Sequence, residues 1–390
     1  MTARRIGAAT LLVIATLLWT AACFGVWAKR QALNTDNWVD TTAQMLQNQR
    51  IRTTLGTVFV DRLYDTTTVE AQIRNVLPPR LDRLAAPAAA GFKEVALRNA
   101  PRVLGTDTAL TAWKTANRQA HRAVLALVDG KVAPNGEVTL NVQDLLRQLA
   151  TGTGLPAGAA DKIPPSVAQI KLLQSSQIKT AQDAVAGFRD AVWVLIVLAI
   201  AAFAGAIYLR EDRRRTFISV GFSLIAAGIA VLALRRLGGV AVVNALADAP
   251  NAHAIAGDVW GIGTSLLVDV AEGTLLFGLF LASAAWLSGP GRVPVGVRRA
   301  SAPMFRDHPG VAHGGLGVAI LLLVLWGPVP WTQRIVPVLI FTVAAFVWLE
   351  WLRRRTVEEF PDVRAGEFRR MVGGGRWFGG EKPDETVPSG

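Results

Sequence analysis

The sequence predicts a mainly α-helical integral membrane protein, in which a bundle of six transmembrane helices carries a mostly helical domain with a small two-stranded sheet outside the membrane. Three observations lead to this fold class. Of the 390 residues, 51% are hydrophobic and only 18% are charged, whereas a soluble domain carries roughly 25% charged residues. The hydrophobic residues gather into long runs, as in helices that cross a membrane. Arginines cluster beside these runs, mostly where one side of the membrane would lie.

Six hydrophobic runs have, or nearly have, the length of about 20 residues that a membrane-spanning helix needs. They are Ile6–Ala28, Ala191–Leu209, Thr216–Leu234, Thr264–Leu287, Gly314–Trp331 and Ile335–Leu352. The fifth run is the weakest, because its apolar part ends in a Gly-Pro-Val-Pro sequence at 327–330. Proline is tolerated near the end of such a helix, so the run remains among the predicted spans.

The spans divide the chain into four expected regions. Residues 1–31 hold the first span, 32–188 an extracytoplasmic domain, 189–352 the other five spans, and 353–390 a cytoplasmic, largely disordered tail. The first span is interpreted as an uncleaved signal anchor. The alternative is cleavage and lipidation at Cys23, because Thr20-Ala21-Ala22-Cys23 loosely fits a lipobox; the apolar run, however, continues beyond it. As the only cysteine, Cys23 also excludes a disulfide within the chain.

The basic residues set the predicted orientation. Four groups fall on one side if six spans exist: Arg4 and Arg5; Arg210, Arg213, Arg214 and Arg215; Arg292, Arg298, Arg299 and Arg306; and Arg353, Arg354 and Arg355. Both termini are therefore expected in the cytoplasm and the protein in the plasma membrane. The net charge of +12 mostly reflects this bias, so it does not call for a nucleic-acid partner. Lys29-Arg30, Arg235-Arg236 and Arg334 are exceptions that the topology places outside.

The segment 32–188 is long enough to form a domain of its own. It opens with Asn34-Thr35-Asp36, a helix-capping cluster, and keeps helical spacing from Ile51 to Leu63. Further helices are expected near 69–77, 80–104 and 107–129. Alternating apolar residues from Val138 to Val142, and a second stretch at Val167–Leu173, predict two strands that pair.

A long helix is expected to join this domain to the second span. Ser175-Ser176 is typical of a helix start, and only Gly187 interrupts the helix-forming residues between Gln177 and Leu209. A continuous helix of this length is about 50 Å long, and it would connect the outer domain rigidly to the membrane. A kink near Gly187 without any coupling is the interpretation that we favour over this rigid connection.

The most unusual charges are Asp269 and Glu272, which lie three residues apart in the fourth span. Counted back from Leu287, Glu272 would lie roughly 8 Å and Asp269 roughly 3 Å inside the outer boundary of the membrane. Arg235 and Arg236 end the third span on the same side. The four residues therefore form a candidate charge cluster in the outer leaflet. The favoured interpretation is interfacial pairing; solvated acids and an ion or proton site are the alternatives.

Little else in the sequence points to chemistry. No Gly-rich phosphate loop, nucleophile elbow or HExxH motif is present. His308 and His313 share a loop without a cysteine, so no metal site or other cofactor is expected. Asp61, Asp65 and Glu70 are the only close acidic group of the outer domain, and such residues on a helix are usually solvated. The protein is therefore not expected to be an enzyme.

Several segments together resemble a known family. They are LNTDNWVDTTAQMLQNQRIRTTL, EVTLNVQDLLRQL, IKLLQSSQIKTAQDAV, AAWLSGPGR, LLVLWGPVPW and LEWLRRRTVEEFPD. The series is similar to an uncharacterised family of multi-pass integral membrane proteins of high-GC Gram-positive bacteria, with an extracytoplasmic domain after the first span. The resemblance extends to about residue 362. It implies this topology and supplies no catalytic residues.

The sequence thus favours a non-enzymatic membrane protein whose outer domain binds an envelope component, an envelope protein or another membrane protein. The state of this outer domain is then relayed through the second span. The alternative function is a transporter or channel component that uses Asp269 and Glu272. The oligomeric state does not follow from the sequence.

Overall fold

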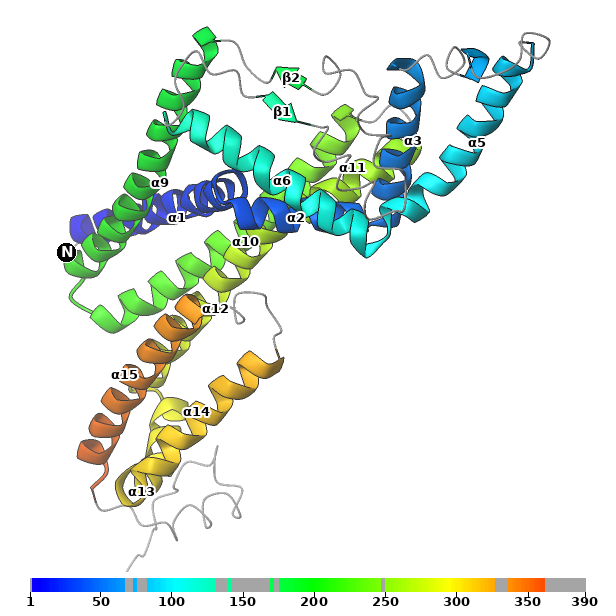
Figure 1. Ribbon diagram of the computed structural model, residues 1–390. Helices are drawn as coiled ribbons and strands as arrows, with labels where there is room; N and C mark the ends of the chain where they lie inside the picture. The colour runs from blue at the N-terminus through cyan, green and yellow to red at the C-terminus, as the bar shows by residue number, and fades with distance from the viewer. Residues whose placement is uncertain are drawn as a thin grey trace, which may run out of the picture. The chain divides into compact units, whose positions relative to one another are not determined.

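The computed structural model describes residues 2–66, 73–75, 83–130, 139–141, 169–171, 175–246, 250–326 and 335–361 (Figure 1). These residues are mainly helical, which confirms the predicted class. The helices of the first half are α1 (Thr2–Leu33), α2 (Thr35–Gln47), α3 (Gln49–Thr66), α5 (Ala85–Leu104), α6 (Asp107–Val128) and α9 (Ser175–Leu209). Those of the second half are α10 (Arg213–Leu246), α11 (Pro250–Gly263), α12 (Ser265–Leu287), α13 (Arg292–Asp307), α14 (Pro309–Trp326) and α15 (Ile335–Glu359).

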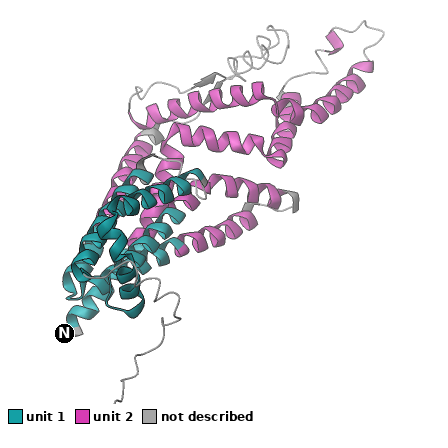
Figure 2. Ribbon diagram, turned by 90° about the horizontal axis from the view of Figure 1, so that it is seen from below, with its two compact units in different colours: residues 1–17, 199–228, 271–390 teal, residues 18–198, 229–270 magenta. Residues whose placement is uncertain are grey.

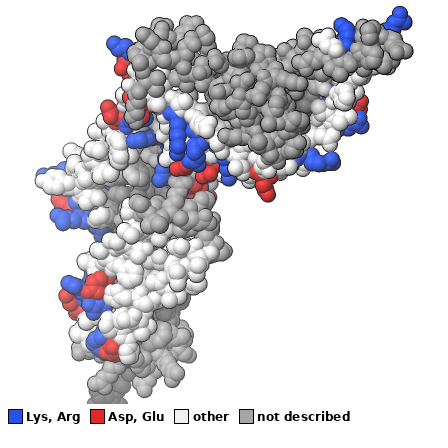
Figure 3. Space-filling view, in the orientation of Figure 1, with Lys and Arg blue, Asp and Glu red and all other residues white. Residues whose placement is uncertain are grey.

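Four of these helices are long and apolar enough to cross a membrane, which agrees with a multi-pass membrane protein. They are Ala3–Leu33, Lys179–Leu209, Arg213–Ala245 and Ser265–Leu287. A fifth candidate arises only if α13 and α14, which meet at a bend of 111°, count as one broken span. On the visible face in Figure 3, charged side chains form separate clusters with broad uncharged areas between them.

The expectation of six spans is not supported by the described residues. α13 carries four arginines and is amphipathic, so it is unsuited to the middle of a membrane. α14 ends at Trp326, and the last residues of the fifth expected span lie outside the described part of the chain. In α15, Glu350 and Arg353–Arg355 shorten the apolar part whose side chains are described.

Helix ends differ from the expectation between the third and fourth predicted spans. α10 continues past Leu234 through Arg235 and Arg236 to Leu246, and the loop that follows holds an unexpected helix, α11. The reason is tertiary. A Cβ atom on Gly239 would lie only 2.6 Å from Trp260 Nε1, so the absence of a side chain at Gly239 lets α11 pack closely on α10.

A short antiparallel pair of strands lies within the two expected strand ranges. β1 (Thr139–Asn141) pairs with β2 (Gln169–Lys171), with Leu140 opposite Ile170. Two strands of this length are marginal in water on their own, so they do not change the helical class of the protein.

The chain divides into two compact units, coloured separately in Figure 2. Unit 1 comprises residues 1–17, 199–228 and 271–390, and unit 2 comprises 18–198 and 229–270. In unit 1, α13, α14 and α15 enclose a small apolar core of Phe305, Ala312, Leu349 and Leu352. α10 and α12 approach closely there, since a Cβ atom on Gly221 would lie 2.8 Å from the Gly278 carbonyl oxygen.

Unit 2 contains two antiparallel helix pairs, α2 with α6 and α3 with α5. α2 starts as expected, because the Asn34 side chain accepts a hydrogen bond from the Asn37 backbone N–H at 2.9 Å. Trp113 of α6 donates to the Thr42 carbonyl of α2 at 3.0 Å. In the second pair, Lys93 forms an ion pair with Asp61 at 2.9 Å. The long helix α9 runs without a break through Gly187, so the kink that the sequence favoured at this position is not present.

Candidate functional site

The turn between α1 and α2 is held in place by a buried histidine of α6. His121 Nε2 lies 3.1 Å from the Ala32 carbonyl oxygen, and Nδ1 lies 3.1 Å from Thr35 Oγ1. Because a carbonyl can only accept, Nε2 carries the hydrogen, and in the neutral ring Nδ1 accepts from the Thr35 hydroxyl. The ring also stacks on Trp38, with centroids 5.1 Å apart.

Burial lowers the pKa of His121, and the hydrogen bond to the Ala32 carbonyl opposes this effect. The imidazole is therefore neutral at pH 7. Arg118 next to it pairs with Asp36 of α2, and Asn37 Nδ2 donates to the Arg30 carbonyl at 3.1 Å. These contacts fix the end of α1 to α2 and α6.

The end of α2 is fixed in turn to α11. Asn48 caps α3 by accepting from the backbone N–H of Ile51 at 3.2 Å, and its amide donates to Asp258 of α11 at 3.2 Å. Arg50 donates to the same carboxylate at 3.3 Å. Asp258 therefore links α11 to the beginning of α3, a contact that the sequence did not predict because 210 residues separate the partners.

The four residues of the predicted charge cluster lie on α10 and α12. Arg235 Nε donates to Thr264 Oγ1 at 2.7 Å, and its Nη2 donates to the Gly261 carbonyl at 3.4 Å. The Thr264 hydroxyl donates to the Trp260 carbonyl at 2.6 Å. Arg235 thus binds the junction between α11 and α12.

Arg236 is exposed, whereas Asp269 and Glu272 are half-buried on α12. Their spacing of three residues places the two acids on one side of the helix. Pairing among the four charges stays a prediction.

Two helices outside the candidate spans expose an apolar surface, which we name the α3–α5 apolar face. It comprises Phe92, Val95 and Val103 on α5, Leu84 just before this helix, and Phe59 and Leu63 on α3. The α5 residues keep the spacing of one helix face, and Phe92 is 61% exposed. The helices themselves carry six basic and three acidic residues, so the apolar residues lie in basic surroundings.

A buried arginine is the clearest feature that sequence analysis missed. Arg298 was expected only as one of the charges that set orientation, yet it is 1% exposed. Its Nε and Nη2 each donate to Glu359 of α15 at 3.0 Å. Its Nη1 donates to the carbonyls of Leu287 and Gly289 at 2.6 and 2.8 Å. The cation thereby binds the end of α12, where free carbonyls and the helix dipole favour positive charge.

Among the described residues, no group of three or more histidine, cysteine, aspartate or glutamate side chains could hold a metal ion. Comparison of the chain with protein-family models, with curated proteins and with solved structures gives no match. The family resemblance of the sequence motifs therefore stays a prediction, and the proposals below rest on the geometry.

Proposed function

We propose that this chain is a non-enzymatic, multi-pass plasma-membrane protein whose helical domain after the first span binds a partner at the cell envelope. Cytoplasmic termini and an extracytoplasmic position for residues 32–188 belong to this proposal. The binding surface is the α3–α5 apolar face, and the partner is a protein segment with apolar side chains and acidic flanks.

The α3–α5 apolar face is the observation that carries the proposal. Protein surfaces outside the membrane rarely expose a continuous apolar patch unless it is used for binding. Phe59 and Phe92 offer aromatic anchors of the kind that dominate protein interfaces. The excess of basic residues on the two helices favours an acidic partner.

The contacts of α6 support a relay from this domain into the spans. Asp129, just after α6, pairs with Arg189 of α9 at 2.9 Å. Gln182 of α9 donates to the Leu127 carbonyl at 2.7 Å. At the other end of the contact network, His121 of α6 binds the end of α1. A partner that shifts α6 would therefore move two spanning helices, and the unbroken α9 carries the movement.

Site-specific photo-crosslinking in the full-length protein tests the binding surface. A photoreactive amino acid at Phe92, introduced in native membranes, is expected to give one defined protein adduct that mass spectrometry can identify. The same group at Lys114 of α6 is the matched control outside the face. Phe59→Ser combined with Val95→Ser should abolish the adduct at position 92 while α-helix content, measured by circular dichroism, is unchanged.

The proposal fails if the adducts at positions 92 and 114 are equal in yield. It also fails if the crosslinks at position 92 are to lipid alone, since the face would then lie against the membrane instead of a protein.

The alternative function is a transporter or channel component, favoured by the half-buried position of Asp269 and Glu272 in a candidate span. Under the main proposal, Asp269→Asn and Glu272→Gln lower the abundance of the protein and leave ion and proton flux into proteoliposomes unchanged. Under the alternative, the same substitutions abolish a flux of the parent protein at unchanged abundance.

A further inference from the structure

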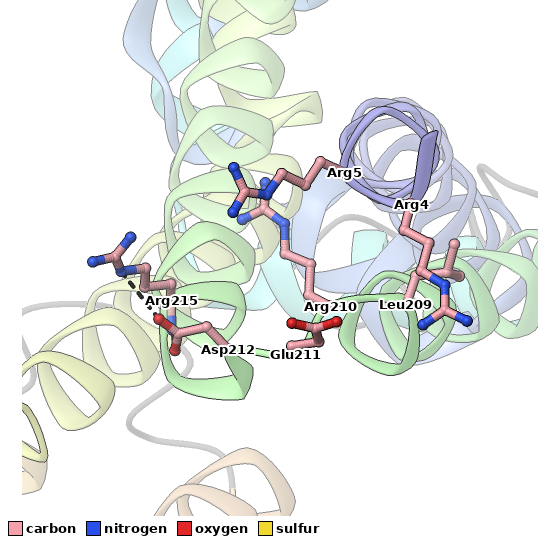
Figure 4. A pocket seen from close by; sticks show the side chains of 7 residues that line it. All are labelled: Arg4, Arg5, Leu209, Arg210, Glu211, Asp212 and Arg215. Atoms are coloured by element: carbon pink, nitrogen blue, oxygen red, sulfur yellow. Dashed lines mark hydrogen bonds and ion pairs between the residues drawn. The ribbon is translucent and has the colours of Figure 1, made fainter. Parts of the chain in front are cut away.

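Three helices of unit 1 enclose a basic cavity of about 560 Å³ (Figure 4). Arg4 and Arg5 come from the beginning of α1, Arg215 comes from the beginning of α10, and Arg210, Glu211 and Asp212 form the connection between α9 and α10. Each of the three helices is a candidate span. The cavity therefore lies at the ends of membrane helices, where lipid headgroups are found.

Close helix packing brings the arginines together. A Cβ atom on Gly7 would lie 3.4 Å from Leu209, and one on Gly205 would lie 3.3 Å from Leu11. The absence of side chains at both glycines lets α1 lie tightly against α9. As a result, Arg5 of α1 and Arg210 after α9 extend toward one another across the cavity (Figure 4).

Only part of this positive charge is neutralised. Arg215 forms an ion pair with Asp212 at 3.0 Å, and Asp212 also accepts from the Arg215 backbone N–H at 3.1 Å. Arg4, Arg5 and Arg210 form no hydrogen bond or ion pair with any residue that the structure describes. Glu211 is the one remaining acid of the lining. The Arg5 and Arg210 guanidinium groups, which extend toward one another while Arg4 extends to the other side, are suited to a phosphate, which accepts paired N–H donors (Figure 4).

A second cavity of about 590 Å³ shares Arg4, Arg210 and Glu211 with the first. Its other side is apolar, lined by Ala204, Ile207 and Phe217 with the exposed ring of Tyr208. A molecule that fits both cavities has a phosphate at one end and a hydrocarbon part at the other. Tyrosine at such a boundary is typical of the membrane interface.

We propose that Arg5 and Arg210 bind the phosphate headgroup of an anionic phospholipid, whose acyl chain lies along Ala204, Ile207 and Phe217. Bound lipid lowers the positive charge of the cavity and holds the beginning of α1 against the connection between α9 and α10. The inference is independent of the α3–α5 apolar face and of any partner bound there.

The test uses the full-length protein in phosphatidylcholine nanodiscs, into which fluorescent phosphatidylglycerol is titrated. The double variant Arg5→Gln/Arg210→Gln is expected to bind phosphatidylglycerol about tenfold more weakly or worse, because it loses charge-assisted hydrogen bonds. The matched control Arg292→Gln/Arg355→Gln removes two exposed arginines elsewhere in unit 1 and should bind as the parent does. Inorganic phosphate in the millimolar range, the probe for a free anion, should not displace the lipid.

A second variant, Ala204→Trp, fills the apolar cavity and keeps every arginine. It is expected to weaken phosphatidylglycerol binding, and it would show the lipid contact even if the double arginine variant failed to fold. If both double arginine variants lose the same affinity for phosphatidylglycerol, the lipid responds only to the overall surface charge, and the proposal is overturned. Displacement by inorganic phosphate, or unchanged lipid binding by Ala204→Trp, would assign the arginines to a free anion and overturn the lipid site.

Discussion

Two groups of arginines in unit 1 differ sharply, although both flank apolar runs and both served to predict orientation. At the end of α12, Arg298 binds Glu359 and two carbonyls, and Arg214 donates to the Ala285 carbonyl at 3.1 Å. In the basic cavity between α1, α9 and α10, Arg5 and Arg210 have no such partners within the described chain. The first group stabilises the fold, and the second is free to bind a ligand.

The comparison teaches that the position of an arginine beside a span does not reveal its role. Orientation rules treat every basic residue near a span alike. The role depends on whether carbonyls or carboxylates of the same chain reach the guanidinium. The predictions below test this distinction, beginning with the largest effect.

Arg298→Leu should produce the greatest loss of stability. Removing the buried cation leaves the Leu287 and Gly289 carbonyls at the end of α12 without their donor, at about 1–3 kcal/mol for each unsatisfied group, and also breaks the pair with the exposed Glu359. We expect a large drop in the thermal unfolding midpoint of the detergent-purified protein, and a smaller drop for Arg298→Lys. A midpoint equal to that of the parent would contradict the structural role of this arginine.

Gly289→Ala should destabilise the same helix end by a smaller amount. A Cβ atom at this position would lie 2.2 Å from Arg214 Nη2, so the guanidinium must move away from the Ala285 carbonyl. The expected cost is about 1–3 kcal/mol.

Gly289→Ala and Arg214→Gln both disturb the hydrogen bond of Arg214 to the Ala285 carbonyl. In a double-mutant cycle, the loss of stability of the double variant should therefore be smaller than the sum of the two single losses. Additive effects would show that Gly289 and Arg214 act separately. As a control, Gly187→Ala in α9, which meets no atom within 4 Å, should be neutral or slightly stabilising.

The stability that His121 gives to the α1–α2 turn should depend on pH between 5 and 8, unlike that of the arginine contacts. The pKa of His121 is lowered in the folded protein, so the unfolded chain binds more protons as the pH falls below about 6.5. Stability is then full above that pH and decreases as the pH falls toward the pKa of the folded state. Thermal unfolding between pH 5 and 8 measures this effect. His121→Gln should remove that part of the pH dependence, and an unchanged profile would contradict the assignment.

Arg5→Gln/Arg210→Gln should have the smallest effect on stability. The substitutions break no hydrogen bond or ion pair with the described residues, and they relieve the repulsion between the two guanidinium groups. The thermal unfolding midpoint in phosphatidylcholine nanodiscs should therefore change by less than about 2 °C. A loss comparable to that of Arg298→Leu would place these arginines in the structural group and erase the contrast.

Much of the helical fold follows from local sequence signals. The cap at Asn34, the spacing from Ile51 to Leu63 and the unbroken run into Leu209 each predicted a helix that the structure contains. These signals depend on residues a few positions apart, so one sequence is enough to read them.

The missed features depend on residues distant in the sequence. α11 and the extension of α10 depend on Trp260 packing against Gly239, and Arg298 is buried only because Glu359 comes within reach. Arg235 also binds a threonine hydroxyl and a carbonyl from residues 26 to 29 positions further along the chain. No local pattern distinguishes these partners from solvent.

The most direct test of the account asks whether residues on either side of α9 face opposite sides of the membrane. Cys23→Ser removes the only cysteine, after which Thr54→Cys on α3 and Glu211→Cys after α9 each introduce one exposed position. In intact cells, a membrane-impermeant maleimide should label the protein carrying Thr54→Cys at once. It should label the protein carrying Glu211→Cys only after permeabilisation. If both proteins are labelled in intact cells, or if only the protein carrying Glu211→Cys is labelled, the outer position of the binding domain and the cytoplasmic position of the basic cavity are contradicted.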